Sequence, residues 1–138
     1  MSSIEDTAAQ FFEACETGQG WEVCNQFCHP DASFSCQADA LAEVDTLAGY
    51  TEWVKGLQGP IPDGGYDLKA FAVDEGRGNV AACAVFSGTH SGDGGPVPAT
   101  GKRAETDYVY VMHFDDGRIR HMTKIWNDGY ALRQLGWV

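Results

Sequence analysis

The stretch that decides the fold runs from residue 108 to residue 126 and reads YVYVMHFDDGRIRHMTKIW. On both sides of residues 115–117 the residue types alternate with a period of two, which is typical of two antiparallel strands joined by a tight turn. We expect a three-residue loop with Gly117 in the left-handed conformation, so that Phe114 lies opposite Arg118. A two-residue loop would shift this register by one residue and mix the two faces of the hairpin.

The two faces of this hairpin differ in chemistry. Because side chains alternate between faces along a strand, the expected register separates two sets. The first set is large, aromatic and partly polar, as a ligand cavity would be, and comprises Tyr108, Tyr110, Met112, Met122, Lys124 and Trp126. The second set is mostly aliphatic with polar ends, as an outer face would be, and comprises Val109, Val111, His113, His121 and Ile125.

The rest of the chain predicts an α+β fold in a single domain, residues 1–138. Apolar residues recur at helical spacing in three segments. The first is near the N-terminus, where Ser2 is the expected N-cap, and the second is a short segment that stops at His29 and Pro30. The third covers residues 46–58. A short strand is expected at residues 34–37. Further strands are expected at residues 66–74, 79–90, 103–114 and 118–126. About three N-terminal helices would therefore cover a curved antiparallel sheet, forming a cone that encloses a hydrophobic pocket.

Composition excludes several classes of protein. Twenty acidic residues against nine basic ones give a net charge of −11, which argues against binding nucleic acid or an anionic membrane surface. The N-terminus has no basic and apolar segments of a secretory signal, and no apolar run approaches the length of a membrane span, so we expect a soluble cytoplasmic protein. The five cysteines include no Cys-x-x-Cys pair, and the four histidines are scattered, so we expect reduced thiols and no metal site.

Several motifs are similar to those of the SnoaL-like polyketide cyclases, which belong to the nuclear-transport-factor-2-like superfamily. They occur in the family's order and spacing over nearly the whole chain. The motifs are HPDASF at residues 29–34, GTHSGD at 88–93, PATGK at 98–102, HFDDGRI at 113–119 and RQLG at 133–136. The superfamily hosts cyclases, isomerases, dehydratases, hydrolases and non-catalytic adaptors, so the resemblance is more specific for the fold than for the reaction.

The resemblance implies an intramolecular aldol ring closure that needs no metal or cofactor, in a protein that forms a homodimer. The family's cyclases use an aspartate on the last strand as acid and base, accompanied by a histidine on the preceding strand. Counted back without a gap from the RQLG motif, the aspartate position falls on Lys124 and the histidine position on Tyr110. Neither family residue is kept in this chain.

Lys124 is thus the centre of the candidate site, and its role is open at this stage. It could extend along apolar surface with its tip in water, bind an anion or an enolate oxygen, or act as a base or amine nucleophile. Asp128 could serve as the acid and base if the alignment slips, although a cap of the following helix or turn is the alternative. Three residues could line the cavity from the helical side, namely Phe34, Tyr50 and Trp53. Alternatively, they belong to the hydrophobic core.

Three functions from different classes remain compatible with these residues. The first is a cyclase or isomerase that acts on a small hydrophobic carbonyl compound by proton transfer. The second is a non-catalytic protein that binds a small molecule, which an inward-pointing lysine would allow to be an anion. The third is an interaction subunit that uses the outer face of the sheet for dimerisation.

Overall fold

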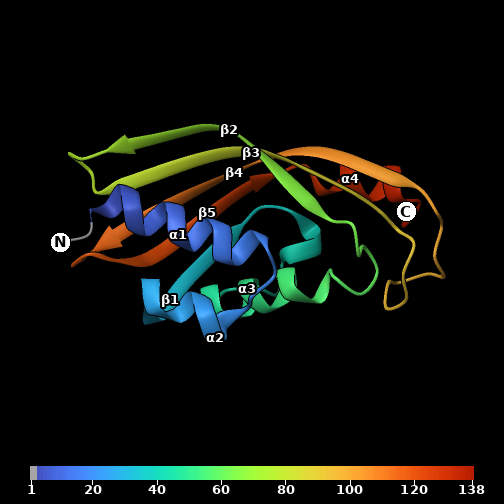
Figure 1. Ribbon diagram of the computed structural model, residues 1–138, viewed down its shortest axis with the longest axis horizontal. Coiled ribbons are helices and arrows are strands. Elements are labelled where there is room, and N and C mark those ends of the chain that lie inside the picture. Colours follow the sequence, from blue (N-terminus) through green and yellow to red (C-terminus); the bar gives the residue numbers. More distant parts are fainter. Residues whose placement is uncertain (1–2) are drawn as a thin grey trace.

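Helix α1 (Ile4–Glu16) is the first element of the computed structural model, which describes residues 3–138 (Figure 1). Its apolar stripe is buried, with Phe11 and Phe12 at its centre. The Ser3 hydroxyl oxygen caps the helix by accepting a hydrogen bond from the Asp6 backbone N–H at 3.1 Å. Ser2, the expected cap, lies outside the described residues. The predicted helix at this end of the chain is confirmed.

The second helical segment is shorter than predicted. Helix α2 (Trp21–Cys24) continues into a 3-10 turn, η1 (Asn25–Phe27), and strand β1 (Cys28–Cys36) begins before His29 and Pro30. The predicted helix ends before His29–Pro30, and the strand predicted at residues 34–37 is confirmed as the last part of a longer strand. Proline is tolerated here because β1 lies at the edge of the sheet and its register is irregular between Cys28 and Ser33.

Two further helices lie against the sheet. The 3-10 turn η2 (Asp39–Leu41) leads to helix α3 (Leu47–Gly56), whose predicted position is confirmed. Helix α4 (Asp128–Leu135) lies at the C-terminus, where the side-chain oxygen of Asn127 caps it by accepting from the Tyr130 N–H. Across residues 3–138, no helix is both long and apolar enough to cross a bilayer.

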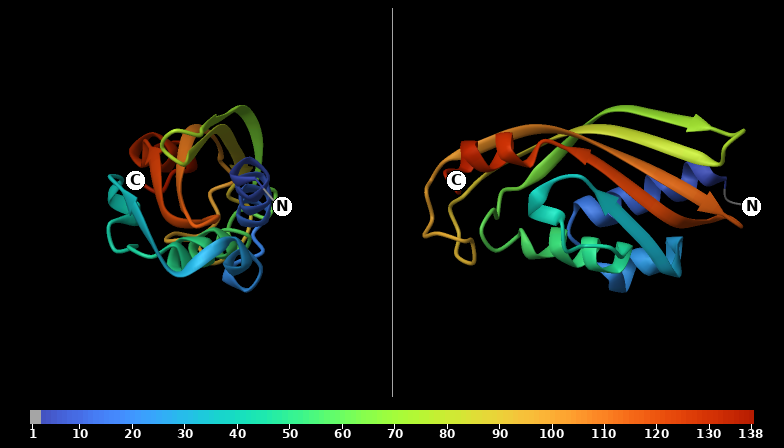
Figure 2. Two further views of the ribbon diagram at one scale, coloured as in Figure 1. Left: turned by 90° about the vertical axis from the view of Figure 1, so that its left-hand side faces the viewer. Right: turned by 180° about the vertical axis from the view of Figure 1, so that it is seen from behind.

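The five strands form one curved, unclosed sheet in the order β1-β5-β4-β3-β2. The later strands are β2 (Gly65–Asp74), β3 (Asn79–Thr89), β4 (Arg103–Asp115) and β5 (Arg118–Trp126), all paired antiparallel. Strand β1 pairs parallel to β5, so the sheet is mixed and not wholly antiparallel as expected. Helices α1, α2 and α3 lie along its concave side, and the end-on view of Figure 2 shows the sheet curling around that space. The α+β prediction is confirmed.

The β4–β5 hairpin keeps the predicted faces through a different register. Its turn has two residues, Asp116 and Gly117, both with positive φ, and Asp115 lies opposite Arg118. A bulge then shifts the pairing by one more residue, so that Tyr110 lies opposite Lys124. The predicted pairs were wrong by two residues. Because a shift of two restores the parity of a strand, the same side chains still face inward.

The long connection from β3 to β4 is held by His90, which directly follows β3. The buried His90 ring accepts hydrogen bonds at Nδ1 from the Trp137 Nε1–H at 2.8 Å and from the Thr100 backbone N–H at 3.3 Å. Its backbone also pairs with Gly101 and Lys102 across the neck of the loop. One imidazole therefore joins this loop to the end of the chain after α4.

The turn geometry predicts a specific cost for losing Gly117. Gly117→Ala places a Cβ in open space but at a φ of +78°, a conformation that L side chains rarely adopt. We expect the free energy of unfolding, measured by urea titration, to fall by about 1 kcal/mol. The matched control is Gly56→Ala, where the Cβ also meets open space but the backbone is helical, and stability should rise by roughly 0.5 kcal/mol. Equal effects of the two substitutions would contradict this turn.

Candidate functional site

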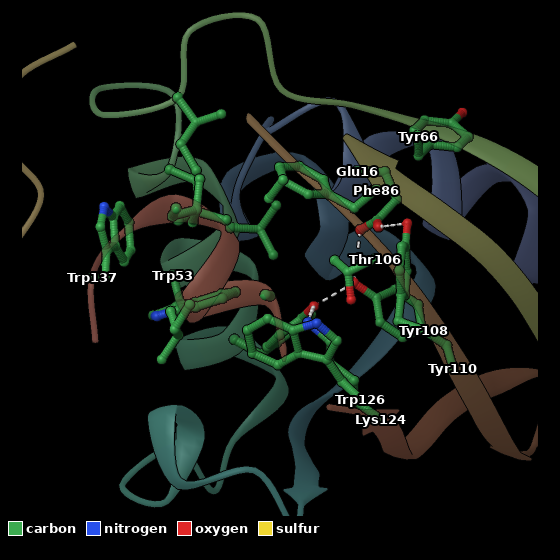
Figure 3. Close-up of a pocket in the computed structure, with 18 residues that line it drawn as sticks. Glu16, Trp53, Tyr66, Phe86, Thr106, Tyr108, Tyr110, Lys124, Trp126 and Trp137 are labelled. Carbon is green, nitrogen blue, oxygen red and sulfur yellow. Dashed lines mark hydrogen bonds between the residues drawn. The ribbon is translucent and has the colours of Figure 1, made fainter. Parts of the chain in front are cut away.

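A cavity of about 70 Å³ opens between the concave side of the sheet and helices α3 and α4 (Figure 3). Its wall is almost wholly apolar or aromatic, and its polar groups come from a few side chains near its base. Figure 3 shows Glu16, Tyr108 and Tyr110 gathered on one side and Trp53 and Trp137 on the other. Because drug-sized ligands occupy pockets of roughly 300–1,000 Å³, a larger ligand would need these indole side chains to move.

Lys124 supplies the positive charge of this cavity. It stands on β5 between Cys36 of β1 and Tyr110 of β4, and its side chain is only 7% exposed. Across residues 3–138 it is the least exposed Lys, Arg, Asp or Glu, and Glu16 is partly buried. Its Nζ donates a hydrogen bond to the Tyr50 hydroxyl at 2.9 Å. The prediction that Lys124 points inward is therefore confirmed, and its tip does not extend into water.

Aromatic rings surround the Lys124 Nζ. The nitrogen lies 4.1 Å from the centroid of the Trp126 ring, 5.0 Å from that of Tyr50 and 5.2 Å from that of Trp53. The rings of Tyr108 and Tyr110 lie within 6 Å as well. The negative face of an aromatic ring attracts a cation, so this arrangement partly replaces the water that burial removes.

A chain of hydrogen bonds connects Lys124 to Glu16, the last residue of α1. The Tyr110 hydroxyl donates to Glu16 Oε2 at 2.8 Å, and the Tyr108 hydroxyl donates to Oε1 of the same carboxylate. The only hydroxyl proton of Tyr110 is donated to Glu16. In the hydrogen bond between the Tyr50 and Tyr110 hydroxyls, Tyr50 must therefore be the donor. The hydrogen bonds from Lys124 to Tyr50, from Tyr50 to Tyr110 and from Tyr110 to Glu16 thus all run toward the carboxylate.

The environment shifts the pKa values of both ends of this chain. Burial lowers the pKa of Lys124 to about 8, and the negative charge of Glu16 offsets part of that effect. Burial raises the pKa of Glu16, opposed by the hydrogen bond from Tyr108, the charge of Lys124 and the hydrogen bond from Tyr110. The pKa values of Tyr50 and Tyr110 are raised, mainly by burial, so both phenols stay protonated. The amine and the carboxyl are therefore the groups that change charge.

The structure brings together about half of the residues predicted for the site. The cavity wall includes the predicted residues Lys124, Tyr110, Tyr108, Trp126, Trp53 and Tyr50. Their roles in function stay predictions.

Four other predicted residues lie away from the cavity wall. Met112 and Met122 are fully buried in the core and form the next inward-facing pair after Tyr110 and Lys124 toward the hairpin turn. Phe34 stacks on Tyr50, with ring centroids 4.4 Å apart. Asp128 accepts hydrogen bonds from the backbone N–H groups of Ala40 and Gly129 at the start of α4. The cap of α4 is Asn127, so the capping alternative for Asp128 was wrong, and its carboxylate instead joins η2 to the first residue pair of α4.

Glu16 is the polar residue of the cavity that sequence reasoning missed. A signal was present, because Glu16 follows Phe12 by four residues and so lies at the edge of the apolar stripe of α1. An acidic residue in that position faces the sheet. The apolar wall contributed by α4 and Trp137 was also missed, since the tail beyond residue 127 gave only a weak helical pattern.

Metal ligation is not supported by the arrangement of donors. Within residues 3–138, no three His, Cys, Asp or Glu side chains are grouped so that they could hold a metal ion. The histidines lie elsewhere: His113 and His121 contact each other on the outer face of the sheet, and His29 contacts the Asp115 carbonyl.

Comparison with known proteins places this fold and cavity in a family. A family model described as SnoaL-like polyketide cyclase matches residues 6–135. The chain belongs to the SnoaL-like polyketide cyclase family. The resemblance inferred from the motifs is thereby confirmed, while a search of curated proteins finds no match.

Solved SnoaL-like structures share the whole fold at low identity. IdmH, a candidate polyketide cyclase from Streptomyces antibioticus, is 26% identical with a TM-score of 0.77, over 98% of this chain and 99% of its own. A candidate polyketide cyclase from Acidithiobacillus ferrooxidans is 23% identical with a TM-score of 0.76, over 99% of this chain and 97% of its own. AclR, a candidate hydroxylase from Streptomyces galilaeus, is 19% identical with a TM-score of 0.76, over 98% of this chain and 85% of its own. Proteins with this fold are therefore named as candidates for more than one activity.

The charge state of Lys124 can be measured directly. In protein labelled with ¹³C at lysine Cε, we expect the Lys124 resonance to titrate with a pKa of about 8, because burial disfavours the ammonium. Lys55, Lys69 and Lys102 are exposed and serve as internal references. Glu16→Gln should lower the pKa of Lys124 further, since it removes a stabilising negative charge. Glu13→Gln, an exposed change in the same helix, should leave it unaltered, and a Lys124 signal titrating with the other lysines would contradict the buried geometry.

Proposed function

We propose that this protein is an enzyme that acts on a small hydrophobic carbonyl compound bound in the cavity beside Lys124. The reaction would be proton transfer at the carbon next to the carbonyl, leading to an aldol-type cyclisation or an isomerisation. The observation that carries the proposal is one buried ammonium, hydrogen-bonded to Tyr50 and connected to Glu16, at the base of an apolar cavity. Membership of a family named for polyketide cyclases supports the same substrate class.

The geometry supplies the two groups that such a reaction needs. Removing a proton next to a carbonyl places negative charge on the carbonyl oxygen, and a cation in a water-poor site stabilises that charge strongly. Lys124 provides the cation. The proton also needs an acceptor, and the site offers the Glu16 carboxylate on the opposite side of the tyrosines. In this proposal Lys124 takes the place of the family's aspartate, and Glu16 of α1 supplies the carboxylate.

A non-catalytic role is the second candidate, and one observation favours it. A lysine ringed by aromatic faces is also a good receptor for the carboxylate of a small apolar acid, and binding needs only fixed charge. Catalysis in addition needs a group that changes protonation near the working pH. Burial lowers the pKa of Lys124 to about 8, which is compatible with that requirement.

Hydrogen exchange tests this proposal without knowledge of the natural substrate. In D₂O, the protein should accelerate deuterium incorporation at the methylene group of phenylacetone, followed by proton NMR. Lys124→Met should reduce the acceleration by about 100-fold, because it removes the group that activates the carbonyl. Lys55→Met, which removes an exposed lysine of α3, is the matched control.

The same variants separate the two candidate functions. Binding of phenylacetate can be followed by the fluorescence of Trp53 and Trp126, which flank Lys124. Lys124-dependent binding of phenylacetate with no exchange of phenylacetone would support the binding protein. Exchange that is unaffected by Lys124→Met would refute the enzyme proposal.

Assembly and location are further parts of the proposal. We expect a cytoplasmic homodimer that pairs through the outer face of the sheet, where Ile125 is 60% exposed and Val109 and Val111 are half-buried. Sedimentation equilibrium should give twice the chain mass at micromolar concentration, and Ile125→Lys should shift the equilibrium toward the monomer. A wild-type monomer under these conditions would exclude the dimer.

A further inference from the structure

The surroundings of Lys124 fit a different cation better than they fit an ammonium. A lysine ammonium has three N–H donors. Among the described residues, one oxygen, the Tyr50 hydroxyl, accepts a hydrogen bond from Nζ, and no ion pair involves this nitrogen. The other near neighbours are aromatic faces. A protonated imine on the same nitrogen keeps a positive charge but has a single N–H, which Tyr50 alone would satisfy.

We infer that Lys124 forms an imine with its carbonyl substrate, an aldehyde or a ketone with an apolar body. This inference deepens the proposed function and rests on it. It assigns Lys124 as the covalent nucleophile of the site, with Tyr50 as the group that passes protons to and from the reacting oxygen. Glu16 holds a proton at the far end of the hydrogen-bond chain.

The chain to Glu16 produces the free amine that attack requires. One proton shifts in each of three hydrogen bonds, from Lys124 to Tyr50, from Tyr50 to Tyr110, and from Tyr110 to Glu16. The result is a neutral amine and a neutral carboxyl group, with no net charge moved out of the cavity. In an apolar site this neutral pair avoids part of the cost of burying two charges.

The condensation then balances within the same groups. The Nζ lone pair forms a bond to the carbonyl carbon while the carbonyl π electrons move to oxygen. That oxygen takes one proton from Nζ through Tyr50. It takes a second from Glu16 through Tyr110 and Tyr50, and leaves as water while the nitrogen lone pair forms the C=N bond. The sum is ammonium plus carbonyl compound giving protonated imine plus water, with no oxidant or reductant.

The imine explains how a chain without the family's aspartate carries out related chemistry. A protonated imine withdraws electrons more strongly than a neutral carbonyl, so the adjacent C–H bond becomes more acidic. Glu16 takes that proton through Tyr110 and Tyr50, and the C–H electron pair forms the C=C bond of a neutral enamine. The enamine carbon then bonds to a second carbonyl carbon, whose oxygen takes the proton back, while the nitrogen lone pair restores the protonated imine. The faces of Trp126 and Trp53 stabilise the delocalised cation before this step. Water entering the cavity afterwards releases the product and restores the amine.

Reductive trapping tests this inference. The protein is incubated at pH 7 with butanal, a slender apolar aldehyde, and sodium cyanoborohydride, which reduces an imine to a stable amine. Peptide mass spectrometry then gives the rate of butylation at each lysine. Lys124 should react at least about 10-fold faster than Lys55, Lys69 and Lys102, because an ordinary lysine with a pKa near 10.4 has far less free amine at pH 7.

Two variants test the role of the hydroxyl. Tyr50→Phe should slow butylation of Lys124 by at least about 10-fold, since it removes the proton donor closest to Nζ. Tyr130→Phe is the matched control, because Tyr130 is 51% exposed on α4, lies outside the cavity wall and takes no part in the hydrogen-bond chain. The comparison among lysines in the wild-type protein needs neither variant to fold.

The outcomes distinguish this inference from the proposed function. Butylation of Lys124 at the rate of the exposed lysines, or none at all, overturns the imine. So does phenylacetone exchange at the wild-type rate in Lys124→Arg, which keeps a cation but cannot form an imine. In either case, exchange that is still lost in Lys124→Met leaves the proposed function standing with a non-covalent lysine. Exchange independent of Lys124 overturns the proposed function itself.

Discussion

The site depends on Tyr110 and Lys124 standing opposite each other on neighbouring strands. That register places a phenol and an amine side by side on the concave face, where Tyr50 of α3 reaches both of them. Compared with a three-residue turn, the two-residue turn at Asp116 and Gly117 shifts the pairing of β4 and β5 by one residue. The bulge next to the turn shifts it by one more. With only one of these shifts, Lys124 would face outward as Ile125 does now, and the cavity would lose its positive charge.

Much of the fold could be predicted because its signals are local. Periodicity placed α1 and α3 and the four antiparallel strands within a few residues of their positions. What was missed depends on contacts between distant segments. Strand β1 is extended from Cys28 because β5 offers it a parallel edge, a partner that lies far away in the sequence. The bulge in β5 likewise leaves no local mark, since it is set by how the sheet curves.

The candidate site divides in the same way. Parity along β4 and β5 identified Lys124 and its aromatic neighbours, because alternation is a property of each strand alone. Glu16 could not be assigned to them from the sequence, since its contact with Tyr108 depends on the angle at which α1 crosses the sheet. The same limit applies to Met112 and Met122, which share the inner face but lie where the helices cover it. The face of the sheet on which a side chain lies can be predicted from the sequence, whereas the helices that cover it along that face cannot.

The hydrogen bond from Trp137 to His90 links a residue of the cavity wall to the tautomer of a buried histidine. Because Nδ1 of His90 accepts from the indole, the imidazole must carry its proton on Nε2, an atom that is buried without a hydrogen-bond partner. Trp137 is also part of the cavity wall. His90 therefore positions one residue of the cavity wall without lining the cavity itself.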